Sequence, residues 1–337
     1  NLHKKEGYMF QHLSYKNIAL DLVRVTEAAA LTSALQIGRG DKEAVDQDAV
    51  NAMRIAFQGL HIRGTVIVGE GEKDGAPMLA PGEDVGFGDG PEMDVAVDPV
   101  DGTSCVAFGR VNGMSCAGLA PKGAMFNPGH SYYAMKMIVG AEAANVIDLD
   151  APVQDNLMHV ARALGKPVTA LNVFVLDKPR HEKLAAEIRA AGARVLLQPE
   201  GDIAGALLAT DPFSEIDMVW GIGGTPEAVI AACGIKGSGG QMLMRLTPKT
   251  QEERKLVEEV DGLSLKTIYT LDDIIKNDTC YFACTGVTGS DLVQGVQYRR
   301  GYAVTSSLST RGRTGTRRYI KAFHDRDKLS KMSSIRY

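Results

Sequence analysis

Apolar residues near the start of the chain recur at the spacing of helices. Between residues 18 and 29 they are three or four positions apart, which predicts an amphipathic helix with Asn17 as its N-cap. Gly38 is typical of a residue that follows the end of such a helix. A second helix with the same spacing is predicted to begin at Asp46 or Asp48.

Runs of β-branched and apolar residues predict strands in the rest of the chain. Two short strands are predicted at 65–68 and 93–97, whereas the region 109–145 shows no clear pattern. The sequence Cys-Tyr-Phe-Ala-Cys at 280–284 predicts a buried strand. In the middle of the chain the pattern predicts strands at 172–176, 193–197 and 216–220, and helices at 181–191, 203–209 and 226–233.

This alternation of strands and helices with short connections is typical of a parallel sheet that helices cover on both faces. The length of 337 residues is about 2.2 times the ~150 residues of a common domain, so two domains or one large α/β unit fit. A polar stretch at 145–170 marks a weak boundary. We therefore expect two halves, at 15–165 and 166–337.

Composition excludes several classes of protein. With 45% apolar and 23% charged residues the chain can form a large core, so it is neither disordered nor collagen-like. Its apolar runs are far shorter than the ~18 residues of a membrane span, and no membrane partner is expected. The aromatic content of 6% argues against a nucleic-acid partner. The five cysteines form no CxxC pair and are expected to be reduced thiols of a cytoplasmic protein.

Charge is unevenly distributed along the chain. The stretch 299–337 contains eleven Lys and Arg against two acidic residues, whereas residues 1–298 contain 26 Lys and Arg against 39 acidic residues. A basic end beside an acidic body indicates a solvated surface, an anionic ligand or a contact between subunits. A homo-oligomer is expected because most oligomers of soluble proteins are assembled from identical chains, and the basic stretch is a candidate interface.

Carboxylates gather where the first two predicted strands end. Glu70, Glu72 and Asp74 follow the first strand, and Asp98 and Asp101 follow the second. Oxygen-only ligands suit hard divalent cations such as Mg²⁺ or Mn²⁺. The histidines do not cluster with cysteines as a zinc site would require. A solvated turn is the alternative interpretation of the first group.

Polar motifs also follow the three predicted strands in the middle of the chain. Ligands bind at the carboxyl ends of strands in open α/β sheets, so these motifs are expected to face one crevice. Lys178 and Arg180 could hold a phosphate, and Glu200 and Asp202 could accept hydrogen bonds from sugar hydroxyl groups. The glycines of 221–227 would let backbone N–H groups approach an anion, although ordinary turn chemistry accounts for them equally well.

One motif and several longer segments resemble a known family of phosphatases. The motif is Asp98-Pro-Val-Asp-Gly-Thr103, which is similar to the DPxDGT motif of the metal-dependent, lithium-sensitive phosphatase superfamily. The longer segments resemble class II (GlpX-type) fructose-1,6-bisphosphatase from about residue 17 to about residue 324, in the order of that family. They are 24–29, 38–42, 50–54, 68–78, 177–181, 200–202 and 221–227.

This resemblance implies a fold and an activity. The fold is the layered α-β-α-β-α sandwich of sugar phosphatases, with a metal-binding N-terminal half and phosphosugar-binding loops in the C-terminal half. The activity is metal-dependent hydrolysis of the 1-phosphate of fructose 1,6-bisphosphate, in gluconeogenesis. Water would attack the phosphorus in line, activated by two or more Mn²⁺ or Mg²⁺ ions.

The resemblance also implies roles for individual residues. The metal set would be Asp46, Glu70, Asp98, Asp101 and Glu227. Thr103 would orient or help to deprotonate the water, with Glu70 or Asp74 as its catalytic partner. Substrate contacts would come from Asp101, Gly102, Thr103, Tyr133, Lys178, Pro179, Arg180, Glu200, Gly201, Asp202 and Gly224.

A few departures from the family pattern leave alternatives open. Asp101 stands where class II members commonly have Glu, and Glu200 stands where Asp is more usual. Tyr132 competes with Tyr133 for the role in substrate contact. The alternative activities are those of a sedoheptulose-1,7-bisphosphatase, a dual sugar bisphosphatase or an inositol-phosphate phosphatase, and the non-enzyme alternative is a phosphosugar-binding regulator. The resemblance points to a homodimer or homotetramer.

Overall fold

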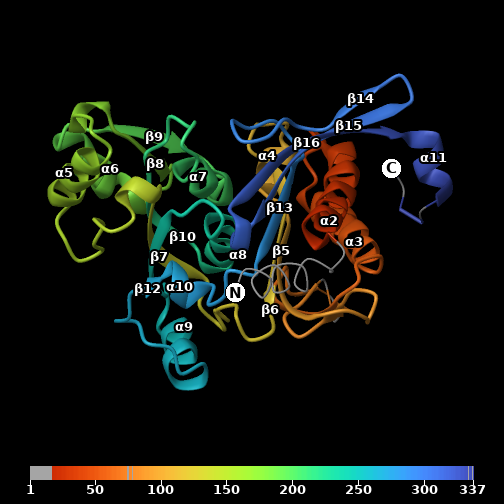
Figure 1. The fold of residues 1–337 in the computed structure, drawn as a ribbon, viewed down its shortest axis with the longest axis horizontal. Helices are drawn as coiled ribbons and strands as arrows, with labels where there is room; N and C mark the ends of the chain where they lie inside the picture. Colours follow the sequence, from red (N-terminus) through yellow and green to blue (C-terminus); the bar gives the residue numbers. More distant parts are fainter. Residues whose placement is uncertain (1–16, 74–75, 78, 333, 336) are drawn as a thin grey trace, which may run out of the picture.

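Helices and strands stack into five alternating layers, α-β-α-β-α (Figure 1). The computed structural model describes residues 17–337 apart from 74–75, 78, 333 and 336. Two sheets form the second and fourth layers, and helices pack on both faces of each sheet. The layered α/β class is therefore confirmed.

The first layer consists of α2 (Ile18–Ser33) and α3 (Lys42–Phe57), which pack on each other and on the first sheet. α2 begins directly after Asn17, as predicted, and the backbone carbonyl of Asn17 accepts hydrogen bonds from its first turn. α3 begins earlier than predicted because the side chain of Asp41 accepts a backbone N–H and caps the helix there. Asp46 consequently lies inside α3 and not at its start.

The first sheet has the strand order β14-β15-β13-β6-β5-β1-β4, and β16 pairs with β15. Strands that are far apart along the chain meet where β6 pairs with β13. The predicted strands 65–68, 93–97 and 280–284 all form here. The strands are β1 (Arg63–Val68), β4 (Asp84–Val85), β5 (Glu92–Asp101), β6 (Met114–Pro121), β13 (Tyr281–Gly286), β14 (Gln297–Arg299), β15 (Tyr302–Arg311) and β16 (Thr316–Asp325).

The second sheet has the strand order β12-β11-β7-β10-β8-β9. β8, β9 and β10 run parallel, which confirms the predicted β-α-β-α-β unit, whereas β7, β11 and β12 run antiparallel to their neighbours. The strands are β7 (Tyr133–Val139), β8 (Asn172–Leu176), β9 (Arg194–Gln198), β10 (Met218–Gly224), β11 (Gln241–Leu246) and β12 (Tyr269–Thr270).

Helices of the third and fifth layers enclose the second sheet. α7 and α8 lie between the two sheets and pack on each other and on strands of both. α5 and α6 cover the outer face, where they form a separate apolar cluster with β7, β8 and β10. The helices of these two layers are α5 (Val153–Ala163), α6 (Glu182–Ala190), α7 (Asp202–Ala209) and α8 (Thr225–Ile235). Four shorter helices of the described residues lie elsewhere, namely α4 (Thr103–Ala107), α9 (Gln251–Lys255), α10 (Leu271–Ile274) and α11 (Arg326–Met332).

β10 is longer than predicted, and this changes the role of its glycines. The segment Met218–Gly224 pairs with β7 along its whole length, so the glycines belong to a strand and do not form a phosphate-binding loop. A side chain at Gly223 would overlap the carboxylate of Asp202, and one at Gly224 would overlap that of Glu227. The glycines therefore leave room for the carboxylates of Asp202 and Glu227.

The two sheets do not follow the division of the chain at residue 165. β7 precedes that position but lies in the second sheet, and β13–β16 follow it but lie in the first sheet. Each sheet thus draws strands from both of the halves 15–165 and 166–337. The division into two domains stays a prediction.

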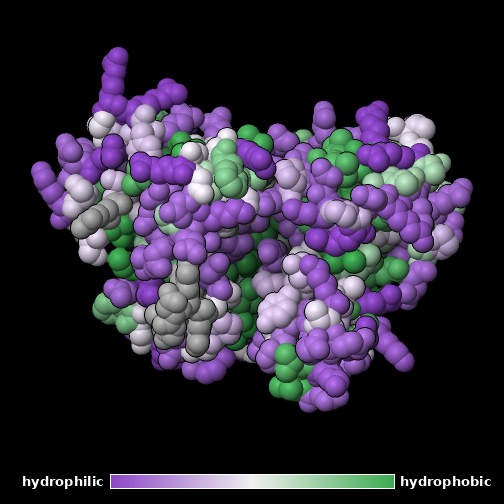
Figure 2. All heavy atoms as spheres, turned by 180° about the vertical axis from the view of Figure 1, so that it is seen from behind, coloured by the Kyte–Doolittle hydropathy of each residue, from purple (hydrophilic) through white to green (hydrophobic). Residues whose placement is uncertain are grey.

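The molecular surface is mainly hydrophilic on the face seen in Figure 2. Apolar side chains lie in small patches and in the hollow near the centre of this view. Among the described residues, no helix combines the length and the apolar character that a membrane crossing needs. All five cysteines are buried free thiols, as expected.

Candidate active site

Two carboxylates face the space between the sheets because β5 contains a bulge. The register of β5 against β6 shifts between Asp98 and Asp101, so that three steps along β5 match two steps along β6. Such a shift reverses the alternation of side chains, and Val100 accordingly packs in the core beneath α2 and α3. Asp98 and Asp101 therefore share the opposite face. They are part of the strand, whereas the sequence pattern predicted a turn after it.

Three further carboxylates come from other elements. Glu70 follows β1, and Glu227 lies in the first turn of α8. Both line one cavity together with Asp98 and Asp101. Asp46 reaches the same region from α3, where its carboxylate accepts a hydrogen bond from Thr103. The five residues that were predicted to hold metal ions are thus brought together by three different elements and one loop.

Burial and the charges of neighbouring carboxylates raise the pKa values of Glu70, Asp98, Asp101 and Glu227. Burial is the largest cause of the raised pKa of Asp98, and the negative charge of Asp101 is the next. The pKa of Asp101 is also well above its ordinary value, through burial and then the charge of Glu227. Glu70 is exposed as a whole residue, yet partial burial of its carboxylate, followed by the charges of Asp46 and Glu227, raises its pKa to about 7. A cation at this position would relieve the repulsion.

Several carboxylate oxygens here have no hydrogen-bond partner although they are buried. They are Oδ2 of Asp101, Oε2 of Glu227 and Oε2 of Glu200. Buried polar atoms without a partner are rare in native proteins, and a bound ion can satisfy those that occur. In this arrangement, no three Asp, Glu, His or Cys side chains of the described residues converge as ligands of a single ion. The donor set nevertheless fits hard divalent cations, because it consists of oxygen atoms alone.

Thr103 begins α4 directly behind the bulge. Gly102 precedes it in a left-handed conformation with φ of 84°, where a side chain would overlap the backbone of Asn112. The Thr103 hydroxyl lies 2.7 Å from Oδ1 of Asp46 and 3.1 Å from the carbonyl oxygen of Val100. The carboxylate that accepts from Thr103 is therefore that of Asp46. The catalytic partnership of Thr103 with Glu70 stays a prediction. The other implied partner, Asp74, lies outside the described residues.

Two cations, Lys178 and Arg180, line the cavity from the segment after β8 of the second sheet, and we call this side its basic end. The acidic end is the side lined by Glu70, Asp98, Asp101 and Glu227. Lys178 follows β8, and the guanidinium of Arg180 donates to the carbonyl oxygen of Ile222 at 2.9 and 3.0 Å. The Arg180 guanidinium also lies 5.6 Å from the ring centre of Tyr133. Tyr133 and Tyr132 both line the cavity, but the contact with Arg180 favours Tyr133 as the substrate residue.

Two residues near this end were missed by the sequence analysis. Lys249 places its Nζ 3.2 Å from the ring centre of Tyr133, so that two cations flank one aromatic ring. The buried carboxylate of Glu253 accepts from the backbone N–H groups of Tyr132 and Lys249, which holds the two segments together. Neither residue belongs to a motif, and tertiary contacts bring both to the site. Lys249 follows β11, which pairs with β7, and Glu253 bonds to the backbone of Tyr132 just before β7.

The motif at the start of α7 forms the floor of the cavity. Glu200, Gly201 and Asp202 all line it, and Gly201 is left-handed with φ of 100°. The carboxylate of Asp202 forms an ion pair with Lys136, a residue of β7 that the sequence analysis did not assign. A lysine within the apolar run 134–139 was the available signal.

The cavity has a volume of about 530 Å³ and collects nearly all of the predicted residues. Six carboxylates line it against two cations, Lys178 and Arg180. Of the predicted set, Asp46 and Pro179 do not line it, although Asp46 contacts Thr103 and Pro179 lies between the two cations. The side chain of Glu72 lies outside the described residues. A ligand with two phosphates fits this polarity if one phosphate meets the cations and divalent ions neutralise the carboxylates at the other end.

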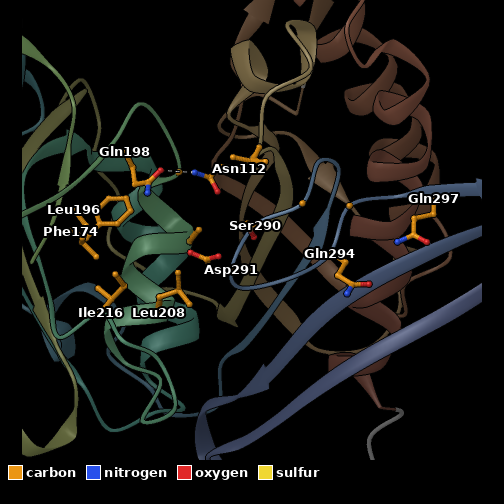
Figure 3. A pocket seen from close by; sticks show the side chains of 15 residues that line it. Asn112, Phe174, Leu196, Gln198, Leu208, Ile216, Ser290, Asp291, Gln294 and Gln297 are labelled. Carbon is orange, nitrogen blue, oxygen red and sulfur yellow. Dashed lines mark hydrogen bonds between the residues drawn. The ribbon is translucent and has the colours of Figure 1, made fainter. Parts of the chain in front are cut away.

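A second cavity of about 510 Å³ lies beside the first, between α7 and the loop after β13 (Figure 3). One wall is apolar, with Phe174, Leu196 and Leu208, and the other carries amide side chains. A hydrogen bond of 3.1 Å joins Asn112 to Gln198 across it. Its lining contains no lysine, arginine or histidine among the described residues, so it offers no side-chain cation for a phosphate.

Comparisons with known proteins agree with this geometry. Residues 16–324 match the family model described as bacterial fructose-1,6-bisphosphatase, glpX-encoded. The chain is 40% identical over 325 residues to fructose-1,6-bisphosphatase 1 class 2 of Escherichia coli K12. The aligned region covers 93% of this chain and 96% of that protein. The fructose-1,6-bisphosphatase class 2 proteins of Escherichia coli O6:H1 and Shigella flexneri are similar to the same extent, with the same coverage.

Proposed function

The chain belongs to the family of bacterial, glpX-encoded fructose-1,6-bisphosphatases, and we propose that it hydrolyses fructose 1,6-bisphosphate in the cavity between its two sheets. It is a phosphoric monoester hydrolase of gluconeogenesis, and the products are fructose 6-phosphate and inorganic phosphate. One observation carries the assignment to this cavity. Its lining combines the four carboxylates Glu70, Asp98, Asp101 and Glu227, which can hold cations, with the two cations Lys178 and Arg180, and this combination suits a substrate with two phosphates.

The reacting phosphate belongs at the acidic end. Bound divalent ions would supply charge neutralisation and activation of water there, held by Asp46, Glu70, Asp98, Asp101 and Glu227. The Thr103 hydroxyl donates a hydrogen bond to Asp46. The lone pairs of the Thr103 oxygen can therefore accept a hydrogen bond from the attacking water. Thr103 thereby orients the water for in-line attack on the 1-phosphate. The carboxylate of Glu70 lines the same cavity as Thr103 and would take up a proton from this water.

The sugar and the distal phosphate belong at the basic end. Lys178 and Arg180 would bind the 6-phosphate with charge-assisted hydrogen bonds. Asp202 and Glu200 would accept hydrogen bonds from sugar hydroxyl groups, and Tyr133 would pack beside the phosphate. Gly201 and Gly224 also line the cavity, where their backbone groups would contact the sugar.

The decisive experiment is phosphate release from fructose 1,6-bisphosphate, with sedoheptulose 1,7-bisphosphate and inositol 1-phosphate in parallel. Each substrate would be assayed with Mn²⁺, with Mg²⁺ and with a chelator. We expect metal-dependent release with the highest kcat/KM on the fructose ester. Equal or greater release from the heptulose ester would move the assignment to a sedoheptulose or dual bisphosphatase. No release from any substrate in the presence of metal would refute the proposal.

We also propose a homodimer or homotetramer in the cytoplasm. Support for the assembly comes from β16, an edge strand of the first sheet that belongs to the basic stretch. Its side chains Tyr319 and Phe323 are 56% and 67% exposed, and an acidic region of a second copy would complement its charge. Support for the location comes from the five free thiols, which suit a reducing compartment. Light scattering would give the mass, and a monomer at micromolar concentration would refute the assembly.

A further inference from the structure

A lysine is buried in the centre of the second sheet. Lys136 lies in β7 opposite Gly221 of β10 and Met244 of β11, and only 2% of its surface is exposed. Alternation along β7 puts it on the same face as Ala134 and Ile138, which belong to the apolar cluster between the sheets. A charged residue at such a position is rare unless it is paired.

Lys136 joins three elements at the floor of the cavity. Its ammonium group forms an ion pair with Asp202, the first residue of α7. The same group donates a hydrogen bond of 2.9 Å to the carbonyl oxygen of Gly224, the last residue of β10. A Cβ at Gly223 would lie 2.7 Å from Nζ and would overlap the Asp202 carboxylate, so glycine is needed there for the pair to form. Lys136 itself does not line the cavity.

The pair is not explained by stability alone. Removing two charges from water costs about as much free energy as their attraction returns, and apolar residues of similar size often replace such pairs without loss. An apolar side chain of similar length would also suit this strand, since Met135 and Met137 flank Lys136 in β7. An apolar residue could not, however, hold the negatively charged Asp202 beside other carboxylates, whereas the positive charge of Lys136 can. Asp202 is close enough to Asp101 and Glu227 to influence their pKa values.

We propose that Lys136 is a positioning residue that fixes Asp202 and the Gly224 carbonyl group for contact with the sugar of the bound phosphosugar. Lys136 engages Oδ2 of Asp202, so that Oδ1 stays available to a sugar hydroxyl group. Without the ammonium group, repulsion from the neighbouring carboxylates would turn Asp202 away from the cavity. This role rests on the proposed function, because it requires that Asp202 contact the sugar.

The test uses Lys136→Met and measures binding as well as turnover. Fructose 6-phosphate is the main probe, because it keeps the sugar hydroxyl groups and the distal phosphate but lacks the reacting phosphate. We expect its affinity, measured by calorimetry, to fall roughly tenfold or more, as for the loss of a hydrogen bond to a charged group. KM for fructose 1,6-bisphosphate should rise in parallel. The melting temperature should fall as well, because the variant leaves the buried carboxylate of Asp202 without its partner. Affinity is therefore measured well below the melting temperature of the variant, where the protein is folded.

Two arms separate positioning from other roles. Inorganic phosphate has no sugar, so the affinity for it should change less than about threefold in Lys136→Met. If the affinity for phosphate fell as much as that for fructose 6-phosphate, Lys136 would only attract anions through its charge. In a double-mutant cycle, Lys136→Met should add little to the effect of Asp202→Asn, and additive losses would refute the link between the two residues. If Lys136→Met does not fold, Lys136→Gln carries the same test.

The matched control is Lys166→Met. Lys166 pairs with Asp217 at 2.5 Å near the opposite end of β10, remote from the lining of the cavity. We expect it to leave the affinity for fructose 6-phosphate unchanged. A Lys136→Met protein that binds the probe like the wild type but melts lower would reduce Lys136 to a structural residue. A wild-type protein that does not bind fructose 6-phosphate would instead refute the proposed function, and the role of Lys136 with it.

Discussion

The two ends of the cavity are built on different principles. The acidic end combines four carboxylates with raised pKa values, and buried oxygens of Asp101 and Glu227 lack hydrogen-bond partners. At the basic end, Arg180 donates to the backbone and His181 bonds to Leu176 and Ile222 at 2.7 Å, whereas Oε2 of Glu200 is buried without a partner. The four carboxylates of the first end are under electrostatic stress, because burial and neighbouring negative charges raise their pKa values.

This difference suggests that the acidic end carries out the reaction and that the basic end recognises the substrate. Raised pKa values and orphaned oxygens are typical of groups arranged for a task other than folding. Pre-formed hydrogen bonds, in contrast, hold side chains ready for a ligand at little further cost in entropy. Substitutions at the acidic end should therefore act on kcat, and substitutions at the basic end should act on KM. Four predictions test this division.

The largest effect is expected for Thr103→Ala. The variant removes the hydroxyl group that Asp46 orients at 2.7 Å, and kcat should fall by about 10²–10⁴-fold. KM for fructose 1,6-bisphosphate should stay within a few-fold of the wild type, because Thr103 is not expected to carry ground-state binding. Steady-state kinetics with saturating Mn²⁺ would measure both constants. Thr103→Ser should recover much of the activity, and near wild-type turnover of Thr103→Ala would remove the residue from the mechanism.

The next effect is expected at the basic end. Lys178→Ala and Arg180→Ala each remove a charged donor, so KM should rise by roughly 10–100-fold while kcat changes little. Lys183→Ala is a matched control, because the Lys183 side chain is 90% exposed and does not line the cavity. A fall in kcat without a rise in KM would contradict the division between the two ends.

A moderate effect is expected on stability as a function of pH. The pKa of Glu70 is raised from an ordinary 4.5 to about 7. A carboxyl group of this kind favours the folded state fully below pH 4.5, and this contribution is lost as the pH rises through 7. The metal-free protein should therefore melt at a lower temperature at about pH 8 than at about pH 6, and Mn²⁺ should raise the melting temperature most at the higher pH.

Differential scanning fluorimetry with and without chelator would measure this dependence. Glu70→Gln is the control, since it cannot ionise, and it should reduce the difference between the two pH values. Asp98, Asp101 and Glu227 shift in the same direction, so a remainder is expected. If the chelated wild type were equally stable at both pH values, the carboxylates would not be under electrostatic stress.

The smallest effect is expected for Lys249→Ala. Lys249 contacts the ring of Tyr133 at 3.2 Å but lies outside the cavity lining, so its charge acts on the distal phosphate at longer range. KM should rise about two- to fivefold, in keeping with one exposed cation–π contact. Lys255→Ala, at the exposed end of the helix α9 that follows Lys249, should have no effect. Equal effects of the two variants would indicate that only the overall surface charge matters.

Much of the fold and of the site could be predicted from local pattern and residue type. The strands β8 and β9 and the helices α6 and α7 lie within one or two residues of their predicted positions, because each is a short run with a clear period. The residue types of the cavity were also foreseeable, since hard cations require oxygen and phosphates require cations. The matching motifs supplied the resemblance that the family comparison confirms.

What the sequence alone determined is therefore which elements form and which chemistry they carry. Tertiary contacts decided the rest. The bulge that turns Asp98 and Asp101 to one face depends on the register of β5 against β6, and the length of β10 depends on its pairing with β7, far earlier in the chain. The pair between Lys136 and Asp202 exists because β7 and α7 meet in space. Such features arise from non-local pairing and from desolvation of neighbouring charges, and neither leaves a period in the sequence.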